Sequence, residues 1–366
     1  MKLFRHIAMI LVLAALAGCA RMEVIPVPDR EVSFAVGSYN HATRANSALQ
    51  DIDGGVYSFN SKAYLYADGY MDSVQSFFGV DGETISAYDA SGNAVTASGT
   101  TITSWAPSHP YFWPKSSNSY IDFVSWYDKN GAPASVEENE VVWTIDGSTR
   151  SLAADDKLMI ADKAWHYNDN ATVHTSVSGV TEGVPTLFHH LLSQVRVVVK
   201  ASKLSDSGTT WTVSASDFVL GNVYTTGSLT LSNSEPAELP STKPWTGSWT
   251  TSGTRSTIDG VSAETTVTTS GVDMLLTRSM IPQPVGSAYI SFSYKVRTQY
   301  DADNYIEETV ETGRLRLSTF TGAGFTWDMN KITTYTVTIN PECNEILVDP
   351  ETSDWTSLSA PALSIE

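Results

Sequence analysis

Apolar residues recur at every second position in several segments of this chain. From Thr333 to Ile339 they alternate with threonines, and similar alternation runs from Ile290 to Val296 and from Val195 to Val199. Successive side chains of a β-strand point to opposite faces, so a period of two predicts strands with one buried and one solvated face. Helical periodicity is nearly absent. The pattern therefore predicts an all-β chain built of antiparallel β-sandwiches.

Length and turn signals predict how these strands are grouped. The chain has 366 residues, and domains average roughly 150 residues, so two domains are expected. The segment 178–185 is polar and carries glycine and proline, which is typical of a connector. We therefore expect one sandwich over residues 45–179, a second over 180–341, and a tail over 342–366.

The N-terminus has the features of an export signal. Lys2 and Arg5 precede an apolar run over residues 7–17, which is too short for a permanent membrane span. The run ends in Leu-Ala-Gly-Cys, which resembles a bacterial lipobox. We expect residues 1–18 to be a lipoprotein signal peptide, Cys19 to be lipidated, and residues 19–44 to form a lipid-anchored leader. An ordinary signal peptide with a chance cysteine is the alternative.

Charge and motifs exclude several classes of function. The chain has 22 basic and 40 acidic residues, a net charge of −18, which argues against a nucleic-acid partner because phosphate binding needs a clustered cationic surface. No nucleophile motif or metal-ligand spacing can be assembled, so we expect no catalytic residue, no metal and no cofactor. We interpret the acidic pairs Glu137-Glu138 and Asp155-Asp156 as solvated turns, since neighbours on a strand face opposite ways.

A dense aromatic and proline segment covers residues 105–114 and includes Trp105 and Trp113. Exposed aromatic rings can stack on sugars, so these two residues are candidate glycan contacts. The same residue types fill sandwich cores more often, because they bury large apolar surfaces. We favour the core interpretation.

A short strand is predicted before the first sandwich. Val32, Phe34 and Val36 alternate with small residues, and a polar stretch ending at Arg44 follows. If this strand packs into the first sandwich, a cut after Arg44 would free it. The sheet would then expose an apolar groove with unpaired backbone groups, which is a template for a strand from another molecule. An ordinary first strand that is never removed is the alternative.

Several segments together resemble the fimbrillin family of type V pilins and related surface lipoproteins. They are the lipobox, the Ala-Thr-Arg-Ala segment 42–45, the Leu-Phe-His-His-Leu-Leu-Ser-Gln-Val-Arg-Val segment 187–197, and the pattern from Phe325 to Lys331 that leads into the last alternating strand. The resemblance implies two tandem transthyretin-like sandwiches and a lipid anchor in the outer membrane. It also implies cleavage by an Arg-specific protease and polymerisation with other pilin subunits by strand exchange. The first candidate for the cleavage is the bond between Arg44 and Ala45, ahead of Arg30 and Arg21.

The donor strand would come from the C-terminal tail. Its candidate residues are Ile346 and Val348, followed by Leu358 and Ala360, and we expect Pro350 to interrupt pairing between the two groups. The resulting hypothesis is a non-catalytic fimbrial subunit or adhesin with a host protein or glycan as receptor. A glycan-binding surface lipoprotein that does not polymerise is the alternative.

Overall fold

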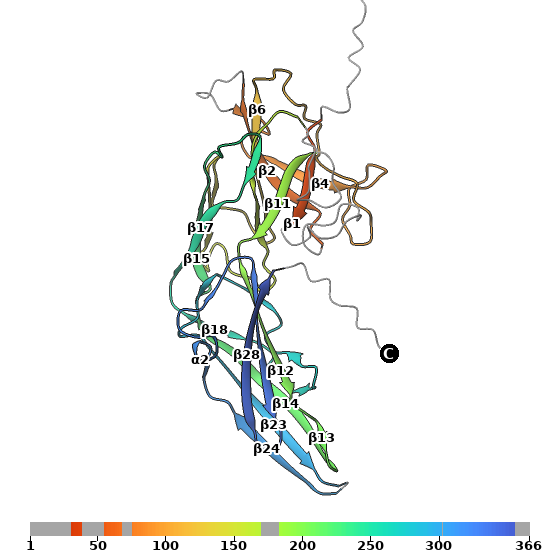
Figure 1. The fold of residues 1–366 in the computed structure, drawn as a ribbon, viewed down its shortest axis with the longest axis vertical. Coiled ribbons are helices and arrows are strands. Elements are labelled where there is room, and N and C mark those ends of the chain that lie inside the picture. Colours follow the sequence, from red (N-terminus) through yellow and green to blue (C-terminus); the bar gives the residue numbers. More distant parts are fainter. Residues whose placement is uncertain (1–30, 39–54, 68–74, 170–182, 302, 356–366) are drawn as a thin grey trace, which may run out of the picture.

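The computed structural model describes residues 31–38, 55–67, 75–169, 183–301 and 303–355. Regular structure in these ranges is almost entirely β, which confirms the predicted all-β class; the one α-helix in them is α2 (Ser318–Thr321). Figure 1 shows an elongated molecule, with β2 (Ser58–Tyr66) near one end and β24 (Tyr305–Glu311) at the other. None of the helical structure described is long and apolar enough to cross a membrane.

A ten-stranded sheet organises the N-terminal part. Its main path has β1 at one edge and β5 at the other, and three short strands pair beside the path. In path order the strands are β1 (Phe34–Ser38), β11 (Val184–His190), β9 (Leu158–Ala161), β6 (Tyr120–Asp128), β2, β4 (Glu83–Tyr88) and β5 (Ser104–Pro107), with β3 (Gln75–Ser76), β10 (Lys163–Tyr167) and β16 (Ser241–Lys243) beside them.

A four-stranded sheet joins segments that lie far apart in the sequence. Its strands, in order, are β17 (Thr246–Ser252), β15 (Thr226–Ser232), β8 (Glu140–Ile145) and β7 (Ser135–Val136). The β15–β17 hairpin thus belongs to a sheet with strands of the N-terminal part, although we expected residues 180–341 to form a sandwich of their own. Long-range pairing of this kind leaves no local mark in the sequence.

The C-terminal part contains three further sheets. A five-stranded sheet consists of β20 (Val272–Asp273), β12 (Ser193–Ala201), β27 (Lys331–Asn340) and β28 (Glu345–Asp354), with β21 (Arg278–Met280) beside β12. A seven-stranded sheet consists of β13 (Ser205–Asp206), β14 (Thr209–Val223), β23 (Tyr289–Gln299) and β24, with β18 (Ser256–Asp259), β19 (Thr265–Val267) and β25 (Leu315–Arg316). β22 (Gln283–Pro284) and β26 (Thr326–Trp327) form a pair of their own.

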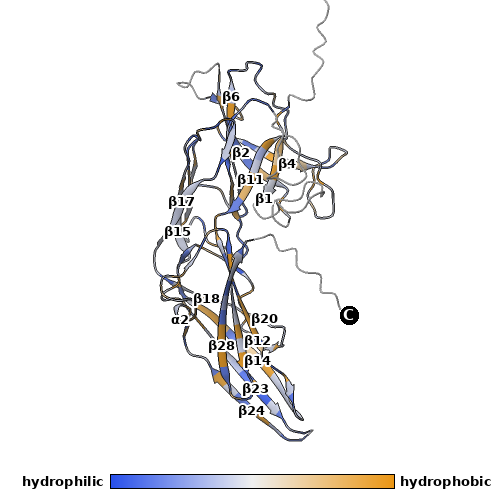
Figure 2. Cartoon of the chain, in the orientation of Figure 1, coloured by the Kyte–Doolittle hydropathy of each residue, from blue (hydrophilic) through white to orange (hydrophobic). Residues whose placement is uncertain are grey.

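The period of two correctly indicates which side chains are buried. Val195, Val197 and Val199 on β12 are fully buried, as are Tyr335 and Val337 on the neighbouring strand. Figure 2 shows the resulting mixture of hydrophilic and hydrophobic residues along the strands. The expected antiparallel pairing needs one correction, because β1 pairs with β11 and β12 with β27 in parallel. Each of these pairs joins segments separated by more than a hundred residues, which allows the long connection that parallel strands require.

Three apolar clusters form the core, and one of them crosses the junction between the two parts. This cluster combines Trp143 and Leu158 from the N-terminal part with Leu192, Ile281 and Trp355 from the C-terminal part. The other two clusters lie within the N-terminal and C-terminal sheets respectively. The chain passes from the ten-stranded to the five-stranded sheet between β11 and β12, about ten residues after the expected boundary at 179/180.

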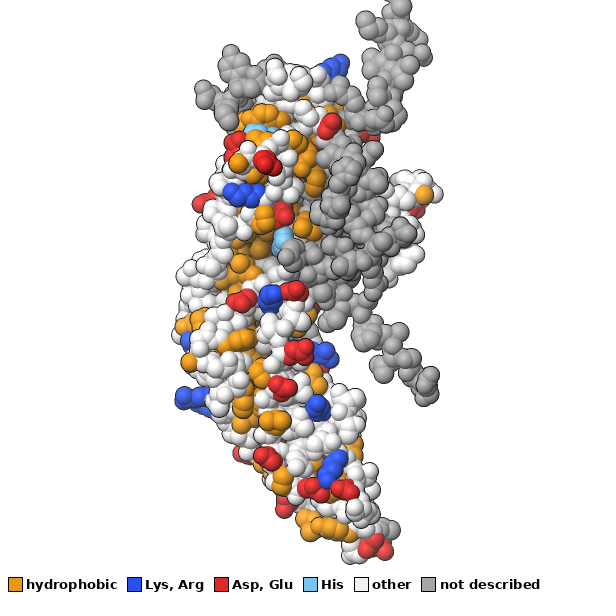
Figure 3. All heavy atoms as spheres, viewed as in Figure 1, with side chains coloured by type: hydrophobic (Ala, Val, Ile, Leu, Met, Phe, Trp, Pro, Cys, Tyr) orange, Lys and Arg blue, Asp and Glu red, His pale blue; other side chains and the backbone are white. Residues whose placement is uncertain are grey.

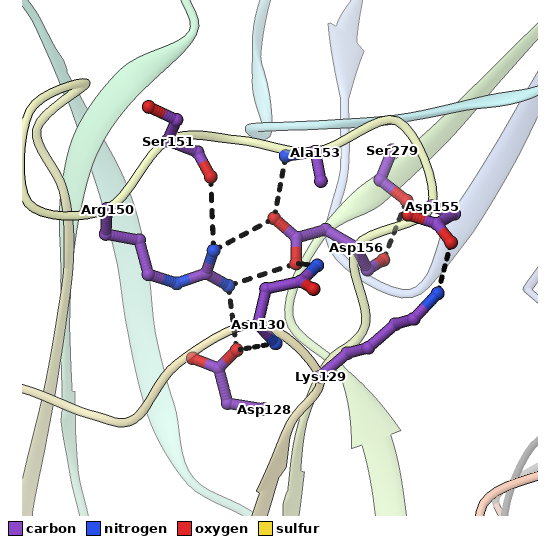
Figure 4. A network of polar contacts seen from close by, with 9 residues as sticks. All are labelled: Asp128, Lys129, Asn130, Arg150, Ser151, Ala153, Asp155, Asp156 and Ser279. Atoms are coloured by element: carbon purple, nitrogen blue, oxygen red, sulfur yellow. Dashed lines mark hydrogen bonds and ion pairs between the residues drawn. The ribbon is translucent and has the colours of Figure 1, made fainter.

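A buried ion cluster closes the loop that follows β8 (Figure 4). Arg150 donates from its two terminal nitrogens to the two carboxylate oxygens of Asp156, at 3.1 Å each, and to Asp128 at 2.8 Å. The side chain of Asp156 is fully buried. Only Asp155, which pairs with Lys129 and is 71% exposed, lies in a solvated turn as expected for this acidic pair. For Asp156 the interpretation as a solvated turn was wrong. A buried carboxylate needs a charged or hydrogen-bonding partner, and here the partner is Arg150, which lies 6 residues earlier in the chain.

The same loop holds the C-terminal part. The hydroxyl of Ser279 donates to the backbone oxygen of Asp156 at 2.8 Å (Figure 4). The Ser279 amide donates to the backbone oxygen of Ala154 at 2.7 Å. Ser279 lies on β21, in the five-stranded sheet. Together with the cluster at the junction, these bonds connect the two parts through side chains and backbone.

Candidate functional site

The first strand lies between two backbone edges. The amide of Val32 donates to the carbonyl oxygen of Tyr111 at 2.8 Å, and the carbonyl of Ser33 accepts the amide of Val184 at 2.8 Å. From Phe34 onward the strand pairs in parallel with β11, Phe34 opposite Val184. Residues 31–38 therefore bridge β11 and the segment around residues 111–112. Figure 1 shows β1 beside β11.

Side chains bury this strand deeply in the N-terminal core. Val32, Phe34 and Val36 are 2%, 1% and 4% exposed, so the alternation seen in the sequence marks the inward face. The ring of Phe34 meets Phe59 and Phe123 edge to face, with both centroid distances 5.6 Å. Burial of an aromatic side chain of this size contributes about 2–3 kcal/mol, so Phe34 anchors the strand.

Gly183 allows the two backbones to approach closely. A Cβ atom at this position would lie 2.8 Å from the amide nitrogen of Ala35 and 2.8 Å from the carbonyl carbon of Phe34. Its φ of +136° is a conformation that essentially only glycine adopts. We interpreted residues 178–185 as a connector; residues 183 and 184 instead lie directly against the first strand. Glycine and proline are common to both roles, so composition alone did not distinguish them.

On the side of the first strand away from β11, the phenol of Tyr111 has a raised pKa. The hydroxyl of Tyr111 donates to Glu83 at 2.6 Å, and this bond, with a smaller effect from burial, raises the pKa of Tyr111 to about 12. The tyrosine is therefore a neutral hydrogen-bond donor at neutral pH. Residues 32–38 themselves carry no charge, so their contacts with the surrounding residues are apolar or through the backbone.

The two candidate glycan residues lie in the core cluster that packs against the first strand. Trp105 is fully buried and Trp113 is 3% exposed. Trp113 meets Phe123 edge to face at 5.9 Å, and Trp105 packs against Phe59 at 5.7 Å. Neither indole exposes a ring face on which a sugar could stack. Both residues lie in the core, as the favoured interpretation predicts. The aromatic floor also includes Phe78 and Phe188, which the sequence analysis did not single out.

The tail candidates divide into two groups. Ile346 and Val348 belong to β28, which pairs antiparallel with β27 over its whole length. The expected interruption at Pro350 is wrong, because Pro350 lies opposite Tyr335 within that ladder. β28 is at the sheet edge, where a proline is tolerated if its missing N–H faces away from the neighbour.

The remaining predicted site residues lie outside the described ranges. They are Cys19, Arg44, Ala45, Leu358 and Ala360. Within those ranges, no group of three or more His, Cys, Asp and Glu side chains is placed to hold a metal ion.

The profile of the fimbrillin-like family matches residues 71–355, and the chain belongs to this family. A fimbrial protein from Bacteroides vulgatus has a similar fold, with a TM-score of 0.52 and 15% identity over 89% of this chain and 100% of that one. The tip fimbrial protein Mfa3 from Porphyromonas gingivalis aligns over 89% of this chain and 100% of its own, at a TM-score of 0.30 and 9% identity. No curated protein matches the sequence.

Proposed function

We propose that this chain is a non-catalytic fimbrial subunit of the cell surface, in which β1 is a removable strand that occupies the place of a donor strand. The burial of Val32, Phe34 and Val36 between two backbone edges carries the proposal. Membership of the fimbrillin-like family and the fold shared with a fimbrial protein support it. The mostly uncharged, polar surface in Figure 3 is in keeping with an exported β protein.

The position of Arg44 is suited to release of the whole strand. β1 ends at Ser38, so a cut after Arg44 leaves all of its residues on the leader and makes Ala45 the new N-terminus. A cut after Arg30 would leave Val32 and Phe34 on the body. A lipid on Cys19 would depart with the leader, so the same cut would detach the subunit from its outer-membrane anchor and open its groove.

An incoming strand has to satisfy three requirements of the groove. It must place apolar side chains where Val32, Phe34 and Val36 lie, pair with β11, and bring its backbone close to Gly183. Leu358 and Ala360 of another subunit are the proposed donors. Ile346 and Val348 are unsuited to this role, because donation would break a ladder of ten residue pairs within their own sheet.

Limited proteolysis of the full-length precursor tests the first half of the proposal. Treatment with an Arg-specific protease is expected to give a body that begins at Ala45, and Arg44→Gln should abolish this product. The matched variant Arg30→Gln should leave it unchanged. A body that begins elsewhere, or equal cleavage of Arg44→Gln, would contradict the assignment.

Assembly tests the second half. Cut wild-type protein should form oligomers on size-exclusion chromatography, while uncut protein should stay monomeric. A synthetic peptide of residues 356–366 should bind the cut body and block oligomers, whereas a scrambled peptide should not. A cut body that stays monomeric and binds neither this peptide nor a pilin partner would refute strand exchange.

A further inference from the structure

A lysine side chain is fully buried near the far end of the N-terminal part. Lys163 lies on β10, and its Nζ is 3.2 Å from Oδ2 of Asp122 on the neighbouring strand β6. It is also 3.2 Å from Oε1 of Glu138, which lies in the turn between β7 and β8. The indole of Trp165 covers it, with Nζ 3.3 Å from the ring centroid. The amine is therefore buried between two carboxyl groups, one from a strand of the ten-stranded sheet and one from the β7–β8 turn.

Asp122 is arranged as an acceptor for attack at its carboxyl carbon. Its side chain is fully buried, and Oδ1 accepts the backbone N–H of His166 at 2.8 Å. Oδ2 has no hydrogen bond in proper geometry, although Nζ lies within ion-pair distance of it. A fixed N–H on one oxygen stabilises the negative charge that a tetrahedral intermediate places there.

The backbone at His166 is shaped to supply that N–H. His166 has a φ of +58°, and the β6–β10 pairing shifts register between Ala164 and Tyr167. Non-glycine residues in this conformation are uncommon and cluster at functional sites. Here the irregularity directs the backbone N–H of His166 at Oδ1 of Asp122.

Burial weakens the ion pair between Asp122 and Lys163. Burial raises the pKa of Asp122 to about 6, although the Lys163 charge opposes this shift. Burial likewise lowers the pKa of Lys163 below its usual range, against the pull of Asp122 and Glu138. Transfer of one proton from the ammonium to the carboxylate gives a neutral amine beside a protonated acid, which is the pair that condenses.

We propose that Lys163 and Asp122 form an intramolecular isopeptide bond. Nζ attacks Cγ of Asp122, and an N–C bond replaces the bond from Cγ to Oδ2. One proton of the amine leaves through Glu138 and joins the departing hydroxyl, so that one water molecule is released. Glu138 contacts Nζ and accepts a hydrogen bond from the hydroxyl of Tyr66, so it is in place to take the proton from the amine, and the condensation needs no further reactant.

Asn139 is the competing partner, since its side-chain oxygen accepts from Nζ at 2.9 Å. Its residue is exposed, however, whereas Asp122 is fully buried. Amide formation is favoured where water is excluded, because the reverse hydrolysis is then suppressed. It is also favoured where the two groups are already held together, because little entropy is lost when they react. The geometry therefore selects Asp122.

The bond would brace the sheet that carries the groove. β6 lies within the main path of the ten-stranded sheet, and the chain between Asp122 and Lys163 includes β7, β8 and the Arg150 loop. A covalent tie between β6 and β10 closes this segment into a ring and restricts the unfolded chain, as a disulfide does. A subunit in a fibre under tension would keep this part folded.

Mass spectrometry of the full chain tests the bond directly. The wild-type protein should be lighter than its sequence by one water, about 18 Da, and a digest should contain a branched peptide that joins Lys163 to Asp122. Lys163→Met should show no loss. Asp122→Asn should lose ammonia instead, about 17 Da, which identifies the carbonyl that reacts. A wild-type protein at its full sequence mass, or a peptide linked through Asn139, would overturn the proposal.

A second pair of variants tests the relay without depending on stability. Glu138→Gln should slow cross-linking by about 100-fold, the usual contribution of a positioned acid–base group. Glu137→Gln changes the neighbouring exposed carboxylate and should react at the wild-type rate. Equal rates in the two variants would remove Glu138 from the mechanism. Branched peptides from the wild-type protein decide the bond itself even if a variant fails to fold.

Discussion

β1 and β28 are both edge strands, yet they are held in place by different forces. β1 has five residues and its anchoring side chains are almost fully buried. β28 has ten residues, pairs with β27 at every one of them, and buries only the side chain of Val348. Deeply buried side chains add to the backbone pairing of the first strand, whereas the second strand depends mainly on its backbone ladder. A strand held by side chains in a groove can be replaced by another with a similar pattern, whereas a ladder in a hairpin is part of the fold.

The two strands also differ in the charged residues and prolines that they carry. β28 carries Glu345, Asp349, Glu351 and Asp354 together with Pro350, and charges and proline are features that prevent a further strand from adding to an edge. Residues 32–38 carry neither charge nor proline. The β28 edge, which stays open in the subunit, is thus protected against pairing with a further strand. The first strand, which we propose is removed, has no such protection.

Truncation of an anchor should separate the two strands most clearly. Phe34→Ala removes a fully buried ring and is expected to lower the free energy of unfolding by about 3–5 kcal/mol. Leu347→Ala on β28 removes a side chain that is 67% exposed and should change it by less than about 0.5 kcal/mol. Urea denaturation of the uncut proteins measures both. Equal losses would show that β1 contributes no more than an exposed strand.

Gly183 offers a narrower test of how β1 is seated. Gly183→Ala places a Cβ against the backbone of residues 34 and 35 and should cost about 2–4 kcal/mol. Gly79 also has a positive φ, of +86°, but no atom lies within 4 Å of its Cβ position, so Gly79→Ala should cost about 1 kcal/mol from the backbone alone. Hydrogen exchange of residues 34–38 should rise only in the Gly183 variant. Unchanged exchange there would contradict the close packing.

The smallest effect on stability is expected on the protected edge. Pro350→Thr restores an N–H on β28 and should change the free energy of unfolding by less than about 0.5 kcal/mol. It should nevertheless increase self-association, because the edge then offers one more backbone donor. Analytical ultracentrifugation of uncut protein measures this, with Pro236→Thr in a loop as the control. Association that is equal in the two variants would mean that Pro350 does not guard the edge.

Local pattern sufficed for part of this molecule. The alternation of Val32, Phe34 and Val36 predicted which face of the first strand is buried, and the alternation from Thr333 to Ile339 did the same for β27. These predictions succeeded because the direction of a side chain on a strand depends only on its parity. The connector assigned to residues 178–185 was not supported at its C-terminal end, since Gly183 contacts β1, nearly 150 residues away in the sequence.

The class of fold and the inward face of each main strand were already present in the order of the residues, because parity and turn chemistry act over a few neighbours. Pairing between distant segments belonged to the folded chain alone. It placed β15 and β17 beside β8, retained Ile346 and Val348 in their own sheet, and buried Asp156 on Arg150 and Lys163 on Asp122. Burial energies and ion pairs depend on which surfaces meet in space, and these contacts join residues whose separation in the chain has no periodic signature.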